Sequence, residues 1–338
     1  METSMMNKTP RRSAIGLVLA MATAFAAFVP ALVGAQTTDG ASAYPTRPVK
    51  MVVPFPAGSS PDIVARYLSQ KLHERTGQPF VVDNRAGAGG AIGAEAVARS
   101  APDGYTTFFM VNSIVTMNQF IYKKLGYDPA KDFAPVSLVA AVPYVLLAHK
   151  NLGASNLQEL IAKAKAKPGS IDYASAGIGG AGHVIMELMS SEADIKLMHI
   201  PFKADGLAAV IGGQVPLMFQ PTTTAVAQIK KGSLIGLGTT GSKRLSALPD
   251  TPAISEVLPR FSADGWQGLM VPAGTPAPIV DRLNKEVAAI LALPETAERF
   301  AALGIEAWHT SPQKMQETIT ADSAKWGKVI QAARIEPN

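Results

Sequence analysis

Short apolar runs and helical patterns alternate along this chain, and the alternation restricts it to α/β folds. Residues 49–55 form an apolar run that ends at a Pro-Ala-Gly turn, as a buried strand does, and residues 61–72 follow with a helical pattern. The order returns farther on, where residues 171–174 predict a strand and residues 183–191 a helix. Strands that alternate with helices build parallel sheets covered by helices on both faces. We therefore predict two α/β lobes with a cleft between them.

The N-terminal segment has the pattern of an export signal. Lys8, Arg11 and Arg12 precede an almost uncharged run over residues 13–35, which ends in Val-Gly-Ala. A basic start, an apolar centre and a small-residue exit are typical of a cleaved signal peptide, here residues 1–35. Two alternatives stay open. The run is long enough for an uncleaved membrane anchor, and the arginine pair admits the twin-arginine export route.

Composition and motifs exclude several classes of protein. With 47% hydrophobic residues, the 338-residue sequence is too apolar for a disordered chain. It contains no Cys, which excludes a disulfide and a cysteine nucleophile. The five His residues show no metal-ligand spacing, and no nucleophile elbow occurs. The formal charge of +5 is partly carried by the signal segment, and no basic cluster is interleaved with aromatic residues. We therefore expect neither metal binding nor nucleic-acid binding.

The turn at residues 55–62 is the first candidate binding loop. Gly58 permits close approach of the backbone, Ser60 is placed to cap a helix, and Pro61 suits the first helical position. Free backbone N–H groups and hydroxyls at a helix N-terminus favour an anion such as a carboxylate. The alternative is a capped turn without a ligand.

Residues 175–183 form a second Gly-rich turn between a predicted strand and a predicted helix. Gly177, Gly179 and Gly182 fit the G-x-G-x-x-G pattern of dinucleotide sites. That pattern also requires an acidic residue at the end of the next strand, and Asp205 comes late for this role. We interpret the turn as a second site for an anion and keep a dinucleotide site as the alternative.

Further candidates follow the ends of predicted strands, where α/β folds place their ligands. They are Asn112 and Ser113 after the third strand, Phe219 and Gln220 after a later one, and Asp205 ahead of a helix, where it caps the helix or contacts a ligand. Aromatic residues either line an apolar wall of the cleft or belong to the core. These are Phe55, Phe202, Phe219 and Trp266.

Nine segments, taken in order, carry a family resemblance. They are Tyr-Pro-Thr-Arg-Pro at 44–48, Val-Pro-Phe-Pro-Ala-Gly at 53–58, Asp-Asn-Arg-Ala-Gly-Ala-Gly-Gly at 83–90, Ala-Pro-Asp-Gly-Tyr-Thr at 101–106, Tyr-Asp-Pro at 127–129, Asp-Phe-Ala-Pro-Val at 132–136, Tyr-Ala-Ser-Ala-Gly at 173–177, Ala-Leu-Pro-Asp-Thr-Pro at 247–252 and Pro-Ala-Gly-Thr-Pro at 272–276. With the helical tail they span essentially the whole mature chain. The chain resembles the Bug family, the extracytoplasmic solute-binding proteins associated with tripartite tricarboxylate transporters.

The resemblance implies a periplasmic-binding-protein (Venus-flytrap) fold with no catalysis, cofactor or metal. Residues 36–140 and 264–338 are expected to form domain 1, and residues 141–263 domain 2. The expected function is that of a monomeric periplasmic receptor, which delivers a small organic acid (a di- or tricarboxylate, or an aromatic acid) to the membrane subunits of the transporter. Together with Phe55, the ligand-binding residues predicted by position are Ala57, Gly58, Ser59, Ser60, Asp62, Asn112, Ser113, Ser175, Ala176, Gly177, Gly179, His183, Lys203, Asp205, Phe219 and Gln220.

Departures from the family pattern leave the ligand open. The first loop of the family usually runs Pro-Gly-Gly-Gly-Thr-Asp, whereas Ser59 and Ser60 replace glycines here, and Phe-Lys-Ala at 202–204 stands where Tyr-Lys-Gly is frequent. Two other functions are weighed against the receptor. One is an exported NAD(P)-dependent oxidoreductase that uses the turn from Gly177 to Gly182, and the other is a ligand sensor for a membrane kinase.

Overall fold

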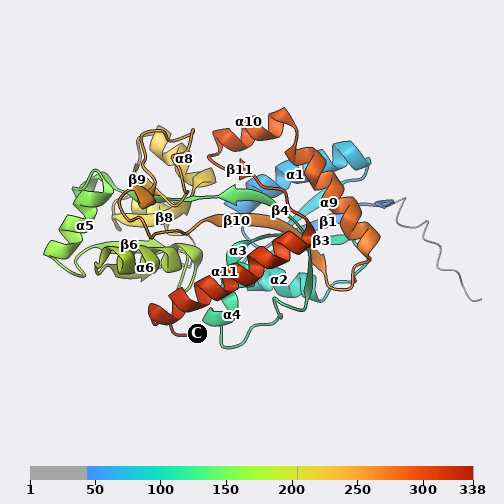
Figure 1. Cartoon of the computed structure of the whole chain (residues 1–338), viewed down its shortest axis with the longest axis horizontal. Coiled ribbons are helices and arrows are strands. Elements are labelled where there is room, and N and C mark those ends of the chain that lie inside the picture. Colours follow the sequence, from blue (N-terminus) through green and yellow to red (C-terminus); the bar gives the residue numbers. More distant parts are fainter. Residues whose placement is uncertain (1–43, 204, 338) are drawn as a thin grey trace, which may run out of the picture. The chain divides into compact units, whose positions relative to one another are not determined.

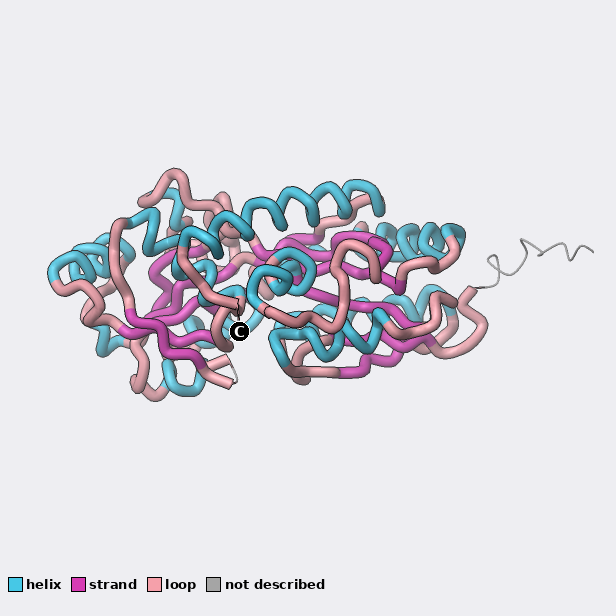
Figure 2. The backbone as a smooth tube through the Cα atoms, turned by 90° about the horizontal axis from the view of Figure 1, so that it is seen from below, coloured by secondary structure: helices cyan, strands magenta, loops and turns pink. Residues whose placement is uncertain are grey.

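The computed structural model of the protein describes residues 44–203 and 205–337. Within them, two β-sheets each lie between layers of helices (Figures 1 and 2). The prediction of two α/β lobes is therefore confirmed. The signal peptide predicted at residues 1–35 lies outside the described residues. We call the sheet that begins with β1 and its helices the first lobe, and the other sheet and its helices the second lobe.

The first sheet has six strands in the order β11-β4-β10-β3-β1-β2. β1 pairs in parallel with β2 and β3, whereas β10 is antiparallel to both β3 and β4. The strands are β1 (Val49–Val53), β2 (Phe80–Asn84), β3 (Thr106–Val111), β4 (Phe133–Val142), β10 (Gly265–Pro272) and β11 (Glu306–Ala307). The alternation predicted a parallel sheet, and this was only partly right. β4 leads out of the first lobe and β10 leads back into it, so these two strands run in opposite directions.

The second sheet has five strands in the order β7-β6-β8-β5-β9 and is mixed in the same way. β6 is parallel to β7 and β8, whereas β5 is antiparallel to β8 and β9. The strands are β5 (Tyr144–Ala148), β6 (Asp172–Ser175), β7 (Met198–Pro201), β8 (Leu217–Pro221) and β9 (Ile235–Thr239).

The chain passes between the lobes along two neighbouring segments. β4 continues into β5 across Pro143, and Gly265 at the start of β10 pairs with Val142, so that the outgoing and returning segments lie side by side (Figure 1). A Cβ atom at Gly265 would lie 2.8 Å from the Tyr144 ring and 2.7 Å from the Val142 carbonyl oxygen. Glycine at position 265 therefore makes room for Tyr144. The domain boundaries near residues 140 and 264 stay a prediction.

The helices follow their sequence signals closely. α1 has Pro61 in its first turn and ends at Gly77, which adopts the left-handed conformation with φ of 72°. The short helices at 112–121 were not predicted, because their β-branched residues indicate strand as readily as helix. The helices are α1 (Ser60–Thr76), α2 (Ala91–Ala98), α3 (Asn112–Thr116), α4 (Asn118–Ile121), α5 (Leu157–Ala166), α6 (Ala181–Ala193), α7 (Leu207–Ile211), α8 (Thr222–Lys230), α9 (Ala277–Leu291), α10 (Pro294–Ala302) and α11 (Pro312–Ala332).

The C-terminal helix α11 belongs to the cores of both lobes. Met315 and Ile319 are buried in a core beside the first sheet, whereas Trp326 and Ile330 are buried in a core of the second lobe. Burial of these side chains fixes α11 across the junction of the lobes. None of the helices in the described part of the chain has the length and apolar character that a bilayer span requires.

Candidate functional site

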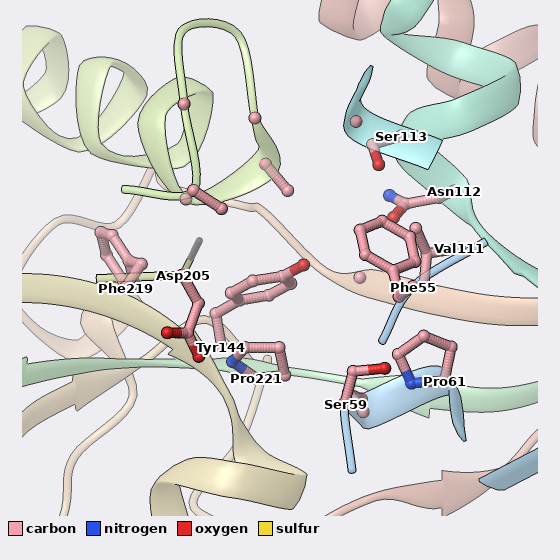
Figure 3. A pocket seen from close by; sticks show the side chains of 18 of the residues that line it. Phe55, Ser59, Pro61, Val111, Asn112, Ser113, Tyr144, Asp205, Phe219 and Pro221 are labelled. Carbon is pink, nitrogen blue, oxygen red and sulfur yellow. The ribbon is translucent and has the colours of Figure 1, made fainter. Parts of the chain in front are cut away.

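A cavity of about 400 Å³ lies between the loops of the two lobes. Figure 3 shows Phe55 and Asn112 of the first lobe on one side of it, and Tyr144 and Asp205 of the second lobe on the other. Twelve of the predicted site residues line this cavity: Phe55, Ser59, Ser60, Asn112, Ser113, Ala176, Gly177, Gly179, Lys203, Asp205, Phe219 and Gln220. Five predicted residues do not line it: Ala57, Gly58, Asp62, Ser175 and His183. That any of them binds a ligand stays a prediction.

The first loop brings the N-terminus of the 17-residue helix α1 to the cavity. Ser59, rather than the predicted Ser60, is the N-cap residue, and its side chain forms no capping hydrogen bond. The Ser59 Oγ is buried and has no hydrogen-bond partner among the described residues. Because a helix N-terminus also presents free N–H groups and a partial positive charge, this corner favours a carboxylate.

Asp62 holds the first loop from behind and does not line the cavity. Its carboxylate accepts hydrogen bonds from the Gly58 N–H and the Arg66 Nε at 2.9 Å, and from the Asn84 Nδ2 at 2.9 Å. Burial opposes ionisation of Asp62, but the bonds from Arg66, Gly58 and Asn84 and the charge of Arg66 outweigh burial and keep its pKa below the usual range. Asp62 thus fixes the shape of the loop.

Unpartnered amides and hydroxyls line the first-lobe side of the cavity. Asn112 and Ser113 begin α3, directly after β3, and are only 3% and 7% exposed. Among the described residues, neither side chain has a hydrogen-bond partner. Gln267 of β10 is also buried; its Nε2 donates to the Ser60 Oγ at 2.7 Å, while its Oε1 has no partner. Buried polar groups normally find partners, so this surface is suited to a polar ligand.

The second loop, residues 176–180, is folded by its own hydrogen bonds. The Gly177 N–H donates to the Ser175 Oγ at 3.1 Å, the Gly179 N–H to the His183 Nδ1 at 2.9 Å, and the Gly180 N–H to the Gly177 carbonyl. These three N–H groups are therefore used within the protein. The first N–H groups of the 13-residue helix α6, at Ala181 and Gly182, remain at the cavity wall.

His183 lies beneath this loop. Its ring stacks on the His199 ring with centroids 3.8 Å apart and an angle of 14° between the planes. The pKa of each residue is lowered to about 4, by burial for His199 and by burial together with the facing His199 for His183. Both imidazoles are therefore neutral at neutral pH.

Two charged side chains line the cavity within the described residues, Lys203 and Asp205. The Asp205 carboxylate accepts hydrogen bonds from the Leu207 N–H and the Gln220 Nε2, both at 3.1 Å. Asp205 thus accepts a hydrogen bond from the first residue of α7, although the N-cap residue of that helix is Gly206, and a contact of Asp205 with a ligand stays a prediction.

Aromatic rings make up much of the remaining wall. The lining aromatic residues are Phe55, Tyr122, Tyr144, Phe202, Phe219 and Trp266. The Tyr144 hydroxyl has no hydrogen-bond partner among the described residues, and Figure 3 shows it directed toward the first lobe. Sequence reasoning missed Tyr122, Tyr144 and Gln267. A polar Gln267 inside an otherwise apolar strand was the one signal that pointed to the site.

The described residues contain no group of three or more His, Asp or Glu side chains that could hold a metal ion.

The fold and the cavity define a two-lobed α/β binding protein with polar donors and aromatic rings at its site. Comparison with known proteins identifies the family of this binding protein. A family model described as "Tripartite tricarboxylate transporter family receptor" matches residues 64–335, and the chain belongs to this family, TctC.

Three solved structures are similar to this chain over nearly their whole length. "R. palustris Rpa4515 with adipate" is 34% identical, with a TM-score of 0.84, covering 87% of this chain and 100% of that one. "Periplasmic binding protein BugD" is 36% identical, with a TM-score of 0.80 and the same coverage. "MatC (Rpa3494) from Rhodopseudomonas palustris with bound malate" is 31% identical, with a TM-score of 0.78, covering 85% and 100%. The resemblance to the Bug family is thus confirmed.

Proposed function

We propose that this protein is a periplasmic solute-binding receptor that captures a small organic carboxylate between its two lobes. The observation that carries the proposal is one cavity with the N-termini of α1 and α6 at its wall and the buried, unpartnered Ser59 hydroxyl beside it. A carboxylate accepts hydrogen bonds from such donors and needs no cationic side chain beside it. Two similar structures, one with adipate and one with bound malate, support the same ligand class.

The walls favour an acid with one or two carboxylates on an apolar body. Six aromatic residues line the cavity, whereas Lys203 is the one cationic side chain at the described wall. A third carboxylate would lie against aromatic faces or near the Asp205 carboxylate, and a charge without a partner is costly to bury. A short aliphatic diacid or an aromatic acid fits this wall, and a tricarboxylate fits it poorly.

Transport and export complete the proposal. The family supports delivery of the ligand to membrane subunits of a tripartite tricarboxylate transporter, and the pattern of residues 1–35 supports export with cleavage of a signal peptide. The protein acts as a monomer without catalysis. Sequencing the N-terminus of protein recovered from the periplasm tests cleavage: a start after Ala35 supports it, and an intact N-terminus shows an uncleaved anchor.

A thermal-shift and calorimetry panel tests the ligand class. The panel contains adipate, malate, terephthalate, citrate and NAD. A ligand at 100 times its Kd stabilises the folded state by about 2.7 kcal/mol, so adipate or terephthalate should raise the melting temperature and citrate should not. No shift with any acid would contradict the proposal, and a shift with NAD alone would favour the oxidoreductase.

A matched pair of variants locates the site. Ser59→Ala should weaken binding of the best acid by about 1–3 kcal/mol, because it removes a hydroxyl that the ligand satisfies. Ser246→Ala is the control, since Ser246 is exposed and forms no hydrogen bond among the described residues. Equal affinities in the two variants would place the ligand elsewhere.

A further inference from the structure

Two stacked imidazoles support the second loop from the side opposite the cavity. His183 is the third residue of α6, and His199 lies in β7, the strand next to β6. Their rings are 3.8 Å apart, and the Tyr173 ring stacks on His199 at 4.9 Å. Tyr173 belongs to the core of the second lobe, and none of the three rings lines the cavity, so the pair joins the core to the second loop.

Each imidazole is bound to a different part of the loop. The Gly179 N–H donates to the His183 Nδ1, which must therefore carry a lone pair and no proton. The His199 Nε2 lies 2.6 Å from the Ser175 Oγ, and the same hydroxyl accepts the Gly177 N–H. The turn from Gly177 to Gly179 thus depends on both rings.

Few titratable groups face the pair. Tyr173 from β6 donates its hydroxyl to the Glu187 carboxylate of α6 at 2.5 Å, and that carboxylate lies 3.9 Å from the His183 Nε2. In the described chain, α11 and β8, which also pack against α6, bring no charged side chain within hydrogen-bond distance of either ring. Glu187 is engaged by Tyr173, and burial lowers the pKa of both histidines to about 4.

We propose that His183 and His199 are positioning residues for the ligand-binding loop, which hold it in shape when both are neutral, and that the loop is released when His183 takes up a proton. This inference rests on the proposed function and adds to it a loss of ligand at acid pH. It assigns His183 a role through Gly179 rather than a contact with the ligand.

The geometry gives the reason. A proton on the His183 Nδ1 would turn the acceptor of the Gly179 N–H into a donor, so that two donors would face each other at 2.9 Å. Gly179 cannot simply withdraw, because it packs against Ile121 on its other side: a Cβ atom placed there would lie within 2.7 Å of three Ile121 atoms. The loop must therefore change shape at the cavity wall when the proton binds.

Two substitutions at one position separate the parts of this argument. His183→Asn keeps an acceptor, because its Oδ1 takes the place of Nδ1, but it cannot titrate. His183→Phe keeps the ring and its stacking but removes the acceptor. The whole mature protein is used, and the chemical shifts of the Gly179 amide and of the imidazole nitrogens are followed by NMR from neutral pH to near pH 4. The Kd for adipate is then measured across the same range.

In the wild type, the Gly179 amide should shift with the same midpoint as the His183 ring, and in His183→Asn it should stay constant. The two carboxylates of adipate also take up protons as the pH falls into the range of ordinary carboxyls, and this affects every variant alike. The wild type should therefore lose about tenfold more affinity than His183→Asn on acidification. His183→Phe should bind about tenfold more weakly even at neutral pH, as expected for an unpaired buried donor.

A Gly179 amide that does not follow the titration of His183 overturns the proposal, as does equal affinity of His183→Phe and the wild type. If no variant binds adipate at neutral pH, the ligand class proposed above is at fault. The NMR titration, which needs no ligand, still decides whether the pair positions the loop.

Discussion

Replacing Gly179 with Ala tests whether the contact between Gly179 and Ile121 shapes the site. Gly179 has a φ of 75°, a left-handed conformation that costs an L-residue about 1–2 kcal/mol. The added Cβ would also overlap three side-chain atoms of Ile121, which comes from α4 and also lines the cavity. Overpacking of this kind costs about 1–3 kcal/mol. The conformational part lowers stability with or without ligand, whereas the overlap opposes the approach of the two walls around a ligand.

We expect Gly179→Ala to raise the Kd of a bound acid by about 5- to 150-fold, the equivalent of the overlap energy. Adding Ile121→Ala removes the overlapping atoms and should restore most of that affinity, while the loss in free energy of unfolding from the left-handed φ persists. Calorimetry of the wild type, both single variants and the double variant gives the coupling energy, expected at about 1–3 kcal/mol. If the second substitution restores nothing, the steric reasoning is refuted.

Three other outcomes are expected. Asp62→Asn should lower the free energy of unfolding by about 1–3 kcal/mol at neutral pH, since charge-assisted hydrogen bonds become weaker. The pKa of Asp62 in the folded state is depressed, so the greater stability of the wild type should disappear as the pH falls below the usual carboxyl range. Urea titrations at several pH values check this. His199→Gln should reduce the loss of stability on acidification. The pKa of His199 is 6.5 in the unfolded state and about 4 in the folded state, so between pH 6.5 and pH 4 the unfolded state takes up the proton first and folding becomes progressively less favourable. Trp266→Phe removes the indole N–H that donates to the Asp322 Oδ2 at 2.7 Å, and it should lower the free energy of unfolding in urea by about 1–3 kcal/mol. Unchanged stability would show that this partly buried hydrogen bond contributes nothing.

The sequence alone predicts those helices and turns whose ends are determined by residues close together in the chain. Pro61 and Gly77 mark the ends of α1, and the glycines of the second loop indicate a tight turn ahead of α6. Each loop follows the carboxyl end of a strand in its own sheet, β1 in the first lobe and β6 in the second, and α/β folds place their ligands at such ends, so a strand-loop-helix pattern also predicts the place of the site.

The rest depends on pairings that no local pattern contains. His183 does not line the cavity, and its ring instead stacks on His199, which comes 16 positions farther on and lies in strand β7. Tyr144 reaches the cavity because Gly265, in a strand of the other lobe, leaves space for its ring. In both cases the deciding neighbour is distant in sequence, and the residue alone gives no sign of the direction of its side chain.

The unpartnered groups at the cavity also explain why such a receptor can be selective. The hydroxyls of Ser59 and Tyr144 can donate hydrogen bonds to a ligand, and no described residue accepts one from either. A ligand of the right shape without carboxylates would cover these groups and leave them unpaired, at about 1–3 kcal/mol for each. An acid that pairs with them avoids that cost while its body contacts the aromatic wall. Discrimination therefore arises chiefly from the penalty on ligands that lack the acid groups, and the rings determine which acid is preferred.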